Sequence, residues 1–259
     1  GLSIEDELRS MRLLQQLRIQ HPVPALFGTV LAHVMPRGTP TEARQSYIDD
    51  FCTQIIAIAA KNAWASYVDV FVEHNAFSAD EARYIAAFAQ KLGLQVKLHV
   101  DQLRDSGGAQ LAAELQALSA DHLEYASDAG IKAMAQAGTI ATLLPGCRLF
   151  LGKFPWPAGR HLIDAGCEIA IATDFNPGSS PIFDLTLCGV LASTQCGLTL
   201  EESLWAMTRG GAKALGLQKH GGLDIGQRAD FVVVDASDWR SIFYHPGDPP
   251  IHSVYIGGE

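Results

Sequence analysis

The sequence predicts an α/β protein built as a (β/α)8 barrel of TIM type. About six of the eight strands would lie in this chain, with a small β-sandwich domain at its C-terminal end. Apolar strand patterns alternate with amphipathic helix patterns, which indicates a parallel sheet covered by helices. Polar side chains end nearly every strand pattern, and beyond Gly216 short strand patterns follow one another without helices between them.

The strand patterns are runs rich in β-branched and aromatic residues, whereas the helix patterns repeat at spacings of three and four. We expect strands at 25–33, 67–73, 95–101, 119–124, 139–144 and 167–174. We expect helices at 41–62, 78–92, 108–117, 127–137, 156–165, 184–194 and 199–215, and an N-terminal helix that begins at Ser3. Capping boxes at Ser78/Glu81 and Thr199/Glu202 support two of these starts.

A doubly wound open sheet is the alternative architecture, and it would place its chemistry in one crevice where the strand order reverses. The sequence instead ends its strands with a series of polar residues, which favours the ring of groups at the carboxyl edge of a barrel. These residues are His33, Glu73, His99, His122 and Asp174. We therefore expect residues 1–216 to form the barrel and 217–259 to be part of the β-sandwich, with two barrel strands preceding Gly1.

Composition excludes several classes of partner. The net charge is −9, and no Lys/Arg cluster appears, so we expect no nucleic-acid partner. No apolar run approaches the roughly 20 residues of a membrane span, and no signal peptide is visible, so we expect no membrane partner. The cysteines form no CxxC pair, which is typical of reduced, buried thiols in a cytoplasmic protein; they are Cys52, Cys147, Cys167, Cys188 and Cys196.

Two histidines and an aspartate at the ends of three different strands point to a metal-assisted hydrolase. His99 and Asp174 are candidate metal ligands, since imidazole and carboxylate suit zinc and iron alike. His122 is either a third ligand or a free acid–base group, and the residues alone leave both open. Asp174 is also a candidate proton acceptor. Taken singly, each histidine is more simply explained as a hydrogen-bonded core residue, and Asp174 as a turn cap, but the matching contexts on three strands favour the functional interpretation.

Further residues at the same edge are candidates for holding a substrate. Gln102 follows His99 by three residues and offers hydrogen bonds without acid–base chemistry, and we expect it to belong to the catalytic residues together with His122 and Asp174. His33 ends the first strand, and the turn with Asn176, Gly178 and Ser179 offers backbone N–H and small polar groups. The carboxylates of Asp69 and Glu73 are more simply explained as buried structural groups.

At these positions the chain resembles the imidazolonepropionase family of the amidohydrolase superfamily. The resemblance runs along essentially the whole sequence. It rests on 31–33 (LAH), 71–73 (FVE), 97–102 (KLHVDQ), 119–125 (SADHLEY) and 172–180 (ATDFNPGSS), with 226–231 (GQRADF) shared more broadly among amidohydrolases. It implies one Zn2+ or Fe3+ ion with His99 and Asp174 among its ligands, and His122 as an unligated catalytic histidine. It also implies substrate contacts at His33, Gln102, Asn176, Gly178 and Ser179.

The family reaction is hydrolysis of a ring C–N bond of 4-imidazolone-5-propanoate, giving N-formimidoyl-L-glutamate. The resemblance therefore implies a small-molecule substrate and a role in histidine degradation, and it leads us to expect a homodimer. Another cyclic amidine hydrolase or a base deaminase of the same superfamily is the alternative function. The family also carries a His-x-His metal motif, which this sequence lacks. We expect that motif upstream of Gly1; otherwise the chain would be a non-catalytic binding subunit.

Overall fold

Six parallel strands form the centre of the computed structural model, which describes residues 3–20, 24–36, 38–153 and 155–259. The strands lie side by side in the order in which they occur along the chain. They are β1 (Thr29–Ala32), β2 (Tyr67–Val72), β3 (Gln95–Val100), β4 (Ser119–His122), β5 (Ile140–Leu143) and β6 (Ile169–Ile171). Because the strand order never reverses, the sheet has no switch point of the doubly wound kind. The barrel prediction is confirmed for the strands in this chain.

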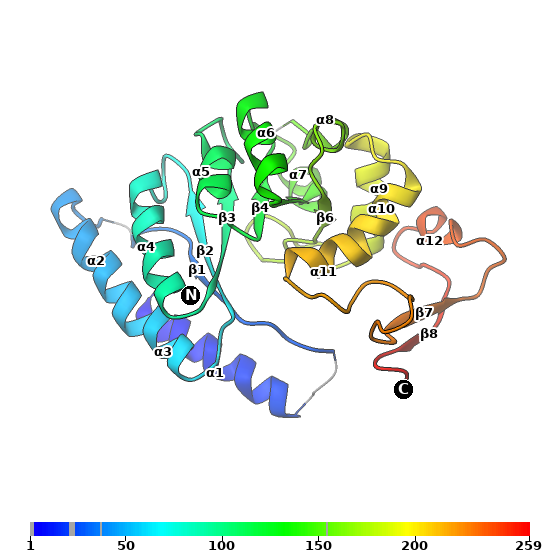
Figure 1. Cartoon of the computed structure of the whole chain (residues 1–259), viewed down its shortest axis with the longest axis horizontal. Helices are drawn as coiled ribbons and strands as arrows, with labels where there is room; N and C mark the ends of the chain where they lie inside the picture. Colours follow the sequence, from blue (N-terminus) through cyan, green and yellow to red (C-terminus); the bar gives the residue numbers. More distant parts are fainter. Residues whose placement is uncertain (1–2, 21–23, 37, 154) are drawn as a thin grey trace.

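Helices follow the strands and lie outside the curved sheet (Figure 1). The helices up to β5 are α1 (Ile4–Gln20), α2 (Arg44–Asp50), α3 (Ala57–Lys61), α4 (Ala79–Lys91), α5 (Gly108–Glu114) and α6 (Asp128–Ala137). The later ones are α7 (Pro145–Leu151), α8 (Gly159–Asp164), α9 (Leu185–Gln195), α10 (Leu200–Trp205), α11 (Gly211–Ala214) and α12 (Ser241–Tyr244). Both expected capping boxes are present, at Ser78/Glu81 and Thr199/Glu202, and Ser3 Oγ accepts a hydrogen bond from the Asp6 N–H.

The helical segments depart from the expected ones in four places. The expected helix at 41–62 consists of a 3₁₀ turn (Thr41–Ala43), α2, a π-helical segment (Phe51–Ile56) and α3. The expected helix at 199–215 likewise contains a π-helical segment, Ala206–Gly210, between α10 and α11. Helix α7 was not expected, although Pro145 at its start and a left-handed Gly152 at its end are typical helix boundaries. The short α12 was not expected either.

The core lies between the sheet and the helices that cover it. Every residue of β2 is buried, which explains why its sequence lacks the alternation of a half-exposed strand. Ile55 and Ile85 pack from the helical side, and Val68 and Leu98 are fully buried in the sheet. This packing fixes the strands, so the side chains that follow the strand ends are held in place.

The C-terminal region forms a smaller sheet than the sandwich that the sequence predicts. In the described residues it contains two antiparallel strands, β7 (Phe231–Val234) and β8 (Ile251–Tyr255), with a register shift between Val233 and Val234. A sheet of two strands is marginally stable by itself. The strands confirm β structure in this region, whereas the β-sandwich and the boundary between 216 and 217 remain predictions.

The five cysteines are free and buried, as expected for reduced core thiols. Burial raises the pKa of the Cys52 thiol to about 12, with a further contribution from Asp49. Within the described ranges, no helix combines the length and the apolar character needed to cross a lipid bilayer.

Candidate metal centre and active site

His99, His122 and Asp174 converge at the carboxyl edge of the sheet. His99 lies in β3, His122 is the last residue of β4, and Asp174 follows β6 by three residues. One potential ligand atom from each of the three lies within 4.8 Å of the others. The two imidazole rings are 5.2 Å apart between centroids. The structure therefore brings together the three residues that the strand-end pattern predicted.

The backbone is strained at these strand ends. Among the described residues other than glycine, six have a positive φ, and four of them follow or end the strands of the site. They are Asp101 (51°), His122 (85°), Leu123 (67°) and Asp174 (52°). A left-handed conformation costs such residues free energy and persists where the surroundings enforce it, often at functional sites.

The imidazole of His99 faces two buried carboxylates on neighbouring strands. Its Nδ1 lies 2.9 Å from Oδ2 of Asp69 on β2 and 3.9 Å from Oδ2 of Asp121 on β4. Burial by itself lowers the pKa of His99, but the two carboxylates, and then Asp174, outweigh burial and raise the pKa to about 9. Because Nδ1 faces these carboxylates, Nε2 is the nitrogen available to the space shared with His122.

His122 has a buried carboxylate of its own. Its Nδ1 lies 3.6 Å from Oε1 of Glu124, and both side chains are almost inaccessible to solvent. Neither Glu124 oxygen has a hydrogen-bond partner in the described part of the chain. A buried carboxylate without hydrogen bonds is costly, so its place beside a histidine calls for a functional explanation.

The loop that carries Asp174 is organised by Asn176. The Asn176 Oδ1 accepts hydrogen bonds from the N–H groups of Gly178 and Ser179, both at 2.8 Å, and its Nδ2 donates to the Asp174 carbonyl at 2.6 Å. The sequence suggested that these two N–H groups could hold a substrate, but in the structure Asn176 already uses them. Ser179 Oγ, 3.4 Å from Asp174 Oδ2, remains beside the carboxylate.

The other expected substrate-contacting residues border the same site. Gln102 is buried, and its Nε2 donates to Cys147 Sγ at 3.5 Å, whereas its Oε1 makes no hydrogen bond within the described ranges. Burial and the negative charge of Asp174 raise the pKa of the Cys147 thiol to about 12. His33 directly follows β1 and stacks on Phe71 at 5.6 Å between ring centroids. Burial, followed by the neighbouring His99, lowers the pKa of His33.

This donor set fits a metal ion. Two imidazoles and one carboxylate are the nitrogen and oxygen donors typical of catalytic zinc and of non-haem iron. Of these, His99 and Asp174 are the predicted ligands, whereas His122 is near enough to be a third or to remain free. The proximity of Glu124 to His122 Nδ1 is compatible with either role.

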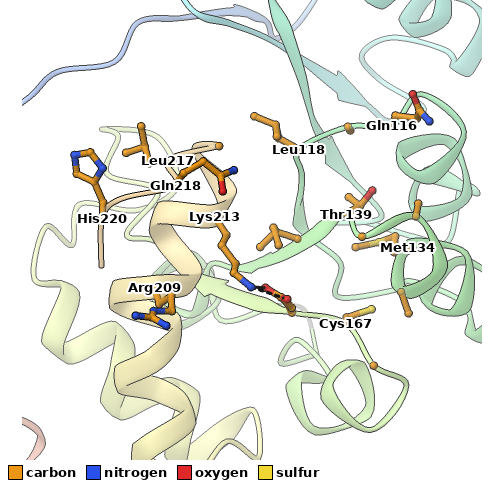
Figure 2. Close-up of a pocket in the computed structure, with 18 of the residues that line it drawn as sticks. Gln116, Leu118, Met134, Thr139, Cys167, Arg209, Lys213, Leu217, Gln218 and His220 are labelled. Carbon is orange, nitrogen blue, oxygen red and sulfur yellow. Dashed lines mark hydrogen bonds and ion pairs between the residues drawn. The ribbon is translucent and has the colours of Figure 1, made fainter. Parts of the chain in front are cut away.

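A separate hollow of about 570 Å³ opens at the opposite end of the strands (Figure 2). Leu118, Thr139 and Glu168, which directly precede β4, β5 and β6, line it. Its lysine and its arginine are already paired: Lys213 contacts Glu168, and Arg209 contacts Asp224. Barrel enzymes keep their chemistry at the carboxyl ends of the strands, so this hollow is not the candidate active site.

Four residues near the site were not predicted as functional from the sequence. Asp69 was expected only as a structural carboxylate, Cys147 only as a core thiol, and Asp121 and Glu124 were given no role. Asp69 is buried, as expected, but it also contacts His99. The signal for Glu124 was present in the sequence, since it follows His122 by two residues.

The sequence profile of the Amidohydrolase family matches residues 33–246, which include every residue of the site. The chain belongs to the amidohydrolase family. The structure agrees with this assignment, because six parallel strands with a metal-ligand cluster at their carboxyl edge form part of such a barrel.

Curated relatives of this amidohydrolase include imidazolonepropionases. The chain is 46% identical over 247 residues to an imidazolonepropionase of Deinococcus deserti, and the matched region covers 95% of the chain and 61% of the relative. It is 45% identical over 258 residues to an imidazolonepropionase of Deinococcus radiodurans and 42% over 260 residues to one of Agrobacterium fabrum, covering 63% and 62% of those proteins. The chain thus spans about three fifths of the length of these relatives.

Solved structures show the same fold at lower identity. An adenosine deaminase from Xanthomonas campestris with bound zinc superposes with a TM-score of 0.73 at 19% identity, covering 96% of this amidohydrolase and 63% of the deaminase. The ochratoxinase of A. niger gives 0.65 at 19% identity over 82% of this chain and 53% of its own. These similarities establish the barrel fold.

Proposed function

We propose that the complete protein is an imidazolonepropionase, a metal-dependent hydrolase of 4-imidazolone-5-propanoate. One observation carries this proposal: His99, His122 and Asp174 converge in a chain that is 46% identical to an imidazolonepropionase. The convergence supports hydrolysis, and the similarity supports the substrate. For the alternatives within the superfamily, another cyclic amidine hydrolase or a base deaminase, the similarity reported above is weaker, since the adenosine deaminase is 19% identical.

The proposed reaction adds one water molecule to the ring. The water oxygen bonds to the ring carbonyl carbon, and the bond between that carbon and the adjacent ring nitrogen breaks. The carbon becomes a carboxylate, and the nitrogen takes up a proton, which gives N-formimidoyl-L-glutamate. The chemistry therefore requires a group that accepts a proton from water and a group that delivers one to nitrogen.

We assign these proton transfers to Asp174 and His122. His99 and Asp174 would hold one Zn2+ or Fe3+ ion, which when bound makes a water molecule acidic enough to react near neutral pH. Asp174 takes the water proton. His122, whose Nδ1 faces Glu124, has its Nε2 available to deliver a proton to the nitrogen of the substrate ring. The remaining metal ligands would come from a His-x-His motif in residues preceding Gly1.

Substrate contacts are assigned to residues around this centre. Ser179 Oγ and the free Oε1 of Gln102 offer a hydrogen-bond donor and an acceptor to the ring. His33 and Gly178 border the same space, and Asn176 acts by shaping the turn. We further propose a barrel at 1–216, a C-terminal β-sandwich portion at 217–259, a homodimeric assembly and a cytoplasmic location.

Turnover by the complete, metal-loaded protein tests the proposal. The expected result is consumption of 4-imidazolone-5-propanoate with formation of N-formimidoyl-L-glutamate, identified by mass. His122→Asn should reduce this rate by about 10²- to 10⁴-fold, since it removes an acid–base group. Ammonia release from purines or pyrimidines without imidazolone turnover would favour the deaminase alternative. A metal-loaded protein inactive on both would support the non-catalytic reading.

A further inference from the structure

The carboxylate of Asp69 has no role in the proposed proton transfers, although it is buried against a predicted metal ligand. Asp69 is 4% exposed and lies in the body of β2. Its Oδ2 is 2.9 Å from His99 Nδ1, which is an ion-pair distance, while neither Asp69 Oδ1 nor His99 Nδ1 has a hydrogen-bond partner among the described residues. A buried carboxylate is costly unless it is paired, so its interaction with His99 is the one that accounts for its place in the core.

His99 links two clusters of side chains. On one side it belongs to the group with His122 and Asp174, and on the other to the group with Asp69 and Asp121. Asp121, in register with His99 on the neighbouring strand, accepts a hydrogen bond from Ser119 Oγ at 2.8 Å. The cluster of Asp69, His99 and Asp121 is therefore held by the backbones of β2, β3 and β4.

We propose that Asp69, supported by Asp121, is a positioning residue that keeps the N–H of His99 on Nδ1 and turns Nε2 toward the metal. The inference rests on the proposed metal site. A histidine that binds a metal through one nitrogen commonly donates the other N–H to a carboxylate, which fixes the ring and makes it a better ligand. Asp69 reaches His99 diagonally, because its register partner on β3 is Lys97.

Metal affinity tests the proposal independently of turnover. In Asp69→Asn, the dissociation constant for Zn2+, measured by competition with a chromophoric chelator, should rise about 10- to 100-fold. Asp121→Asn should have a smaller effect, because its carboxylate lies 3.9 Å from Nδ1. Asp184→Asn is the matched control: Asp184 caps α9 through Thr186 and Leu187 and also accepts a hydrogen bond from the Gly247 N–H. Its Zn2+ affinity should be unchanged.

The proton on His99 Nδ1 provides a second readout. In protein labelled with ¹⁵N-histidine, wild type should show a downfield Nδ1–H resonance, retained when Zn2+ is added. Asp69→Asn should shift it upfield, whereas Asp184→Asn should not. Loss of the signal on adding Zn2+ would place the metal on the carboxylate side and overturn the proposal. Unchanged affinity and an unchanged resonance in Asp69→Asn would also overturn it.

If Asp69→Asn does not fold, the wild-type protein still tests the positioning role. Absence of the downfield Nδ1–H resonance of His99 would then contradict the proposal by itself. These outcomes are separable from the substrate assignment. A protein that binds Zn2+ with the expected Asp69 dependence but does not turn over imidazolone propanoate would retain the positioning role and lose the proposed function.

Discussion

Glu124 lies with its Oε1 3.6 Å from Nδ1 of His122, and both atoms are buried without a hydrogen-bond partner in the described residues. The backbone between them is strained, with φ values of 85° at His122 and 67° at Leu123. Two costly features, a desolvated carboxylate and a left-handed segment, thus occur together beside the proposed acid–base histidine. We therefore expect Glu124 to orient His122 in the proposed proton transfer.

Replacement of Glu124 tests this relationship. Glu124→Gln should lower kcat about 10- to 100-fold, as expected when the carboxylate partner of a functional histidine is lost. The thermal midpoint should be maintained or rise, because a buried charge is removed. Glu114→Gln, which changes an exposed partner of Arg83, is the control and should leave kcat unchanged. An equal kcat in the Glu124 and Glu114 variants would argue against an orienting role.

Two adjacent serines in the loop after β6 have different expected roles, one in substrate binding and one in stability. Ser179 Oγ lies beside Asp174, whereas Ser180 is fully buried and donates to the Thr173 carbonyl at 2.7 Å. Ser179→Ala should lower kcat/KM and change the free energy of unfolding by less than about 1 kcal/mol. Ser180→Ala should lower the free energy of unfolding by about 0.5–1.5 kcal/mol, because it removes the hydrogen bond between the buried hydroxyl and the partly buried Thr173 carbonyl.

Steady-state kinetics and urea unfolding of both serine variants check this contrast. If Ser179→Ala has normal kinetics, the hydroxyl is not a substrate contact. The loop would then serve only to hold Asp174.

The ion pair between Arg44 and Glu81 gives the stability a predictable pH dependence. Burial raises the pKa of Glu81, but hydrogen bonds from Arg44 and Ser78 outweigh it and lower the pKa below its ordinary value. The carboxylate form is favoured in the folded state. Its contribution is therefore present above the ordinary glutamate pKa and disappears as pH falls through the lowered folded value.

Glu81→Gln should consequently destabilise the protein at pH 7 by about 1 kcal/mol, a value discounted for partial exposure. The difference from wild type should shrink as pH falls below about 4.3, the ordinary glutamate value, because both proteins then lack the charge. Urea unfolding across a pH series measures this. A difference that stays constant into acid would show that the Arg44 contact does not control the effect.

The residues at the strand ends were predictable from the sequence, whereas the contact of Asp69 with His99 was not. His99, His122 and Asp174 each lie at or near the end of a strand pattern, and parallel strands bring their carboxyl ends to one edge. The contact of Asp69 with His99 depends on strand register, which pairs Asp69 with Lys97 and leaves His99 on the diagonal. The sequence alone does not say how far β2 is shifted along β3, and this shift decides which side chains meet. Helix α7, by contrast, has typical boundary residues, Pro145 and Gly152, but its seven residues are too few to show a helical repeat.

Two neighbouring glycines, Gly210 and Gly211, lie in helical segments that pack on β6, the strand before Asp174. A Cβ on Gly210 would lie 2.0 Å from the Ile169 carbonyl oxygen, a clash with the backbone of β6. A Cβ on Gly211 would meet its nearest neighbour, the Ala206 carbonyl oxygen, at 3.8 Å, which is an ordinary contact. Gly210→Ala should therefore cost about 3 kcal/mol or more through overpacking. Gly211→Ala should stabilise the helix by up to about 1 kcal/mol.

Because β6 positions the loop with Asp174, Gly210→Ala should also weaken Zn2+ binding, and Gly211→Ala should not. Urea unfolding and Zn2+ competition on the same two variants measure both effects. If Gly210→Ala lost stability but kept wild-type Zn2+ affinity, the loop would hold Asp174 independently of β6. Asn176 and Ser179, rather than the strand, would then set the geometry of the metal site.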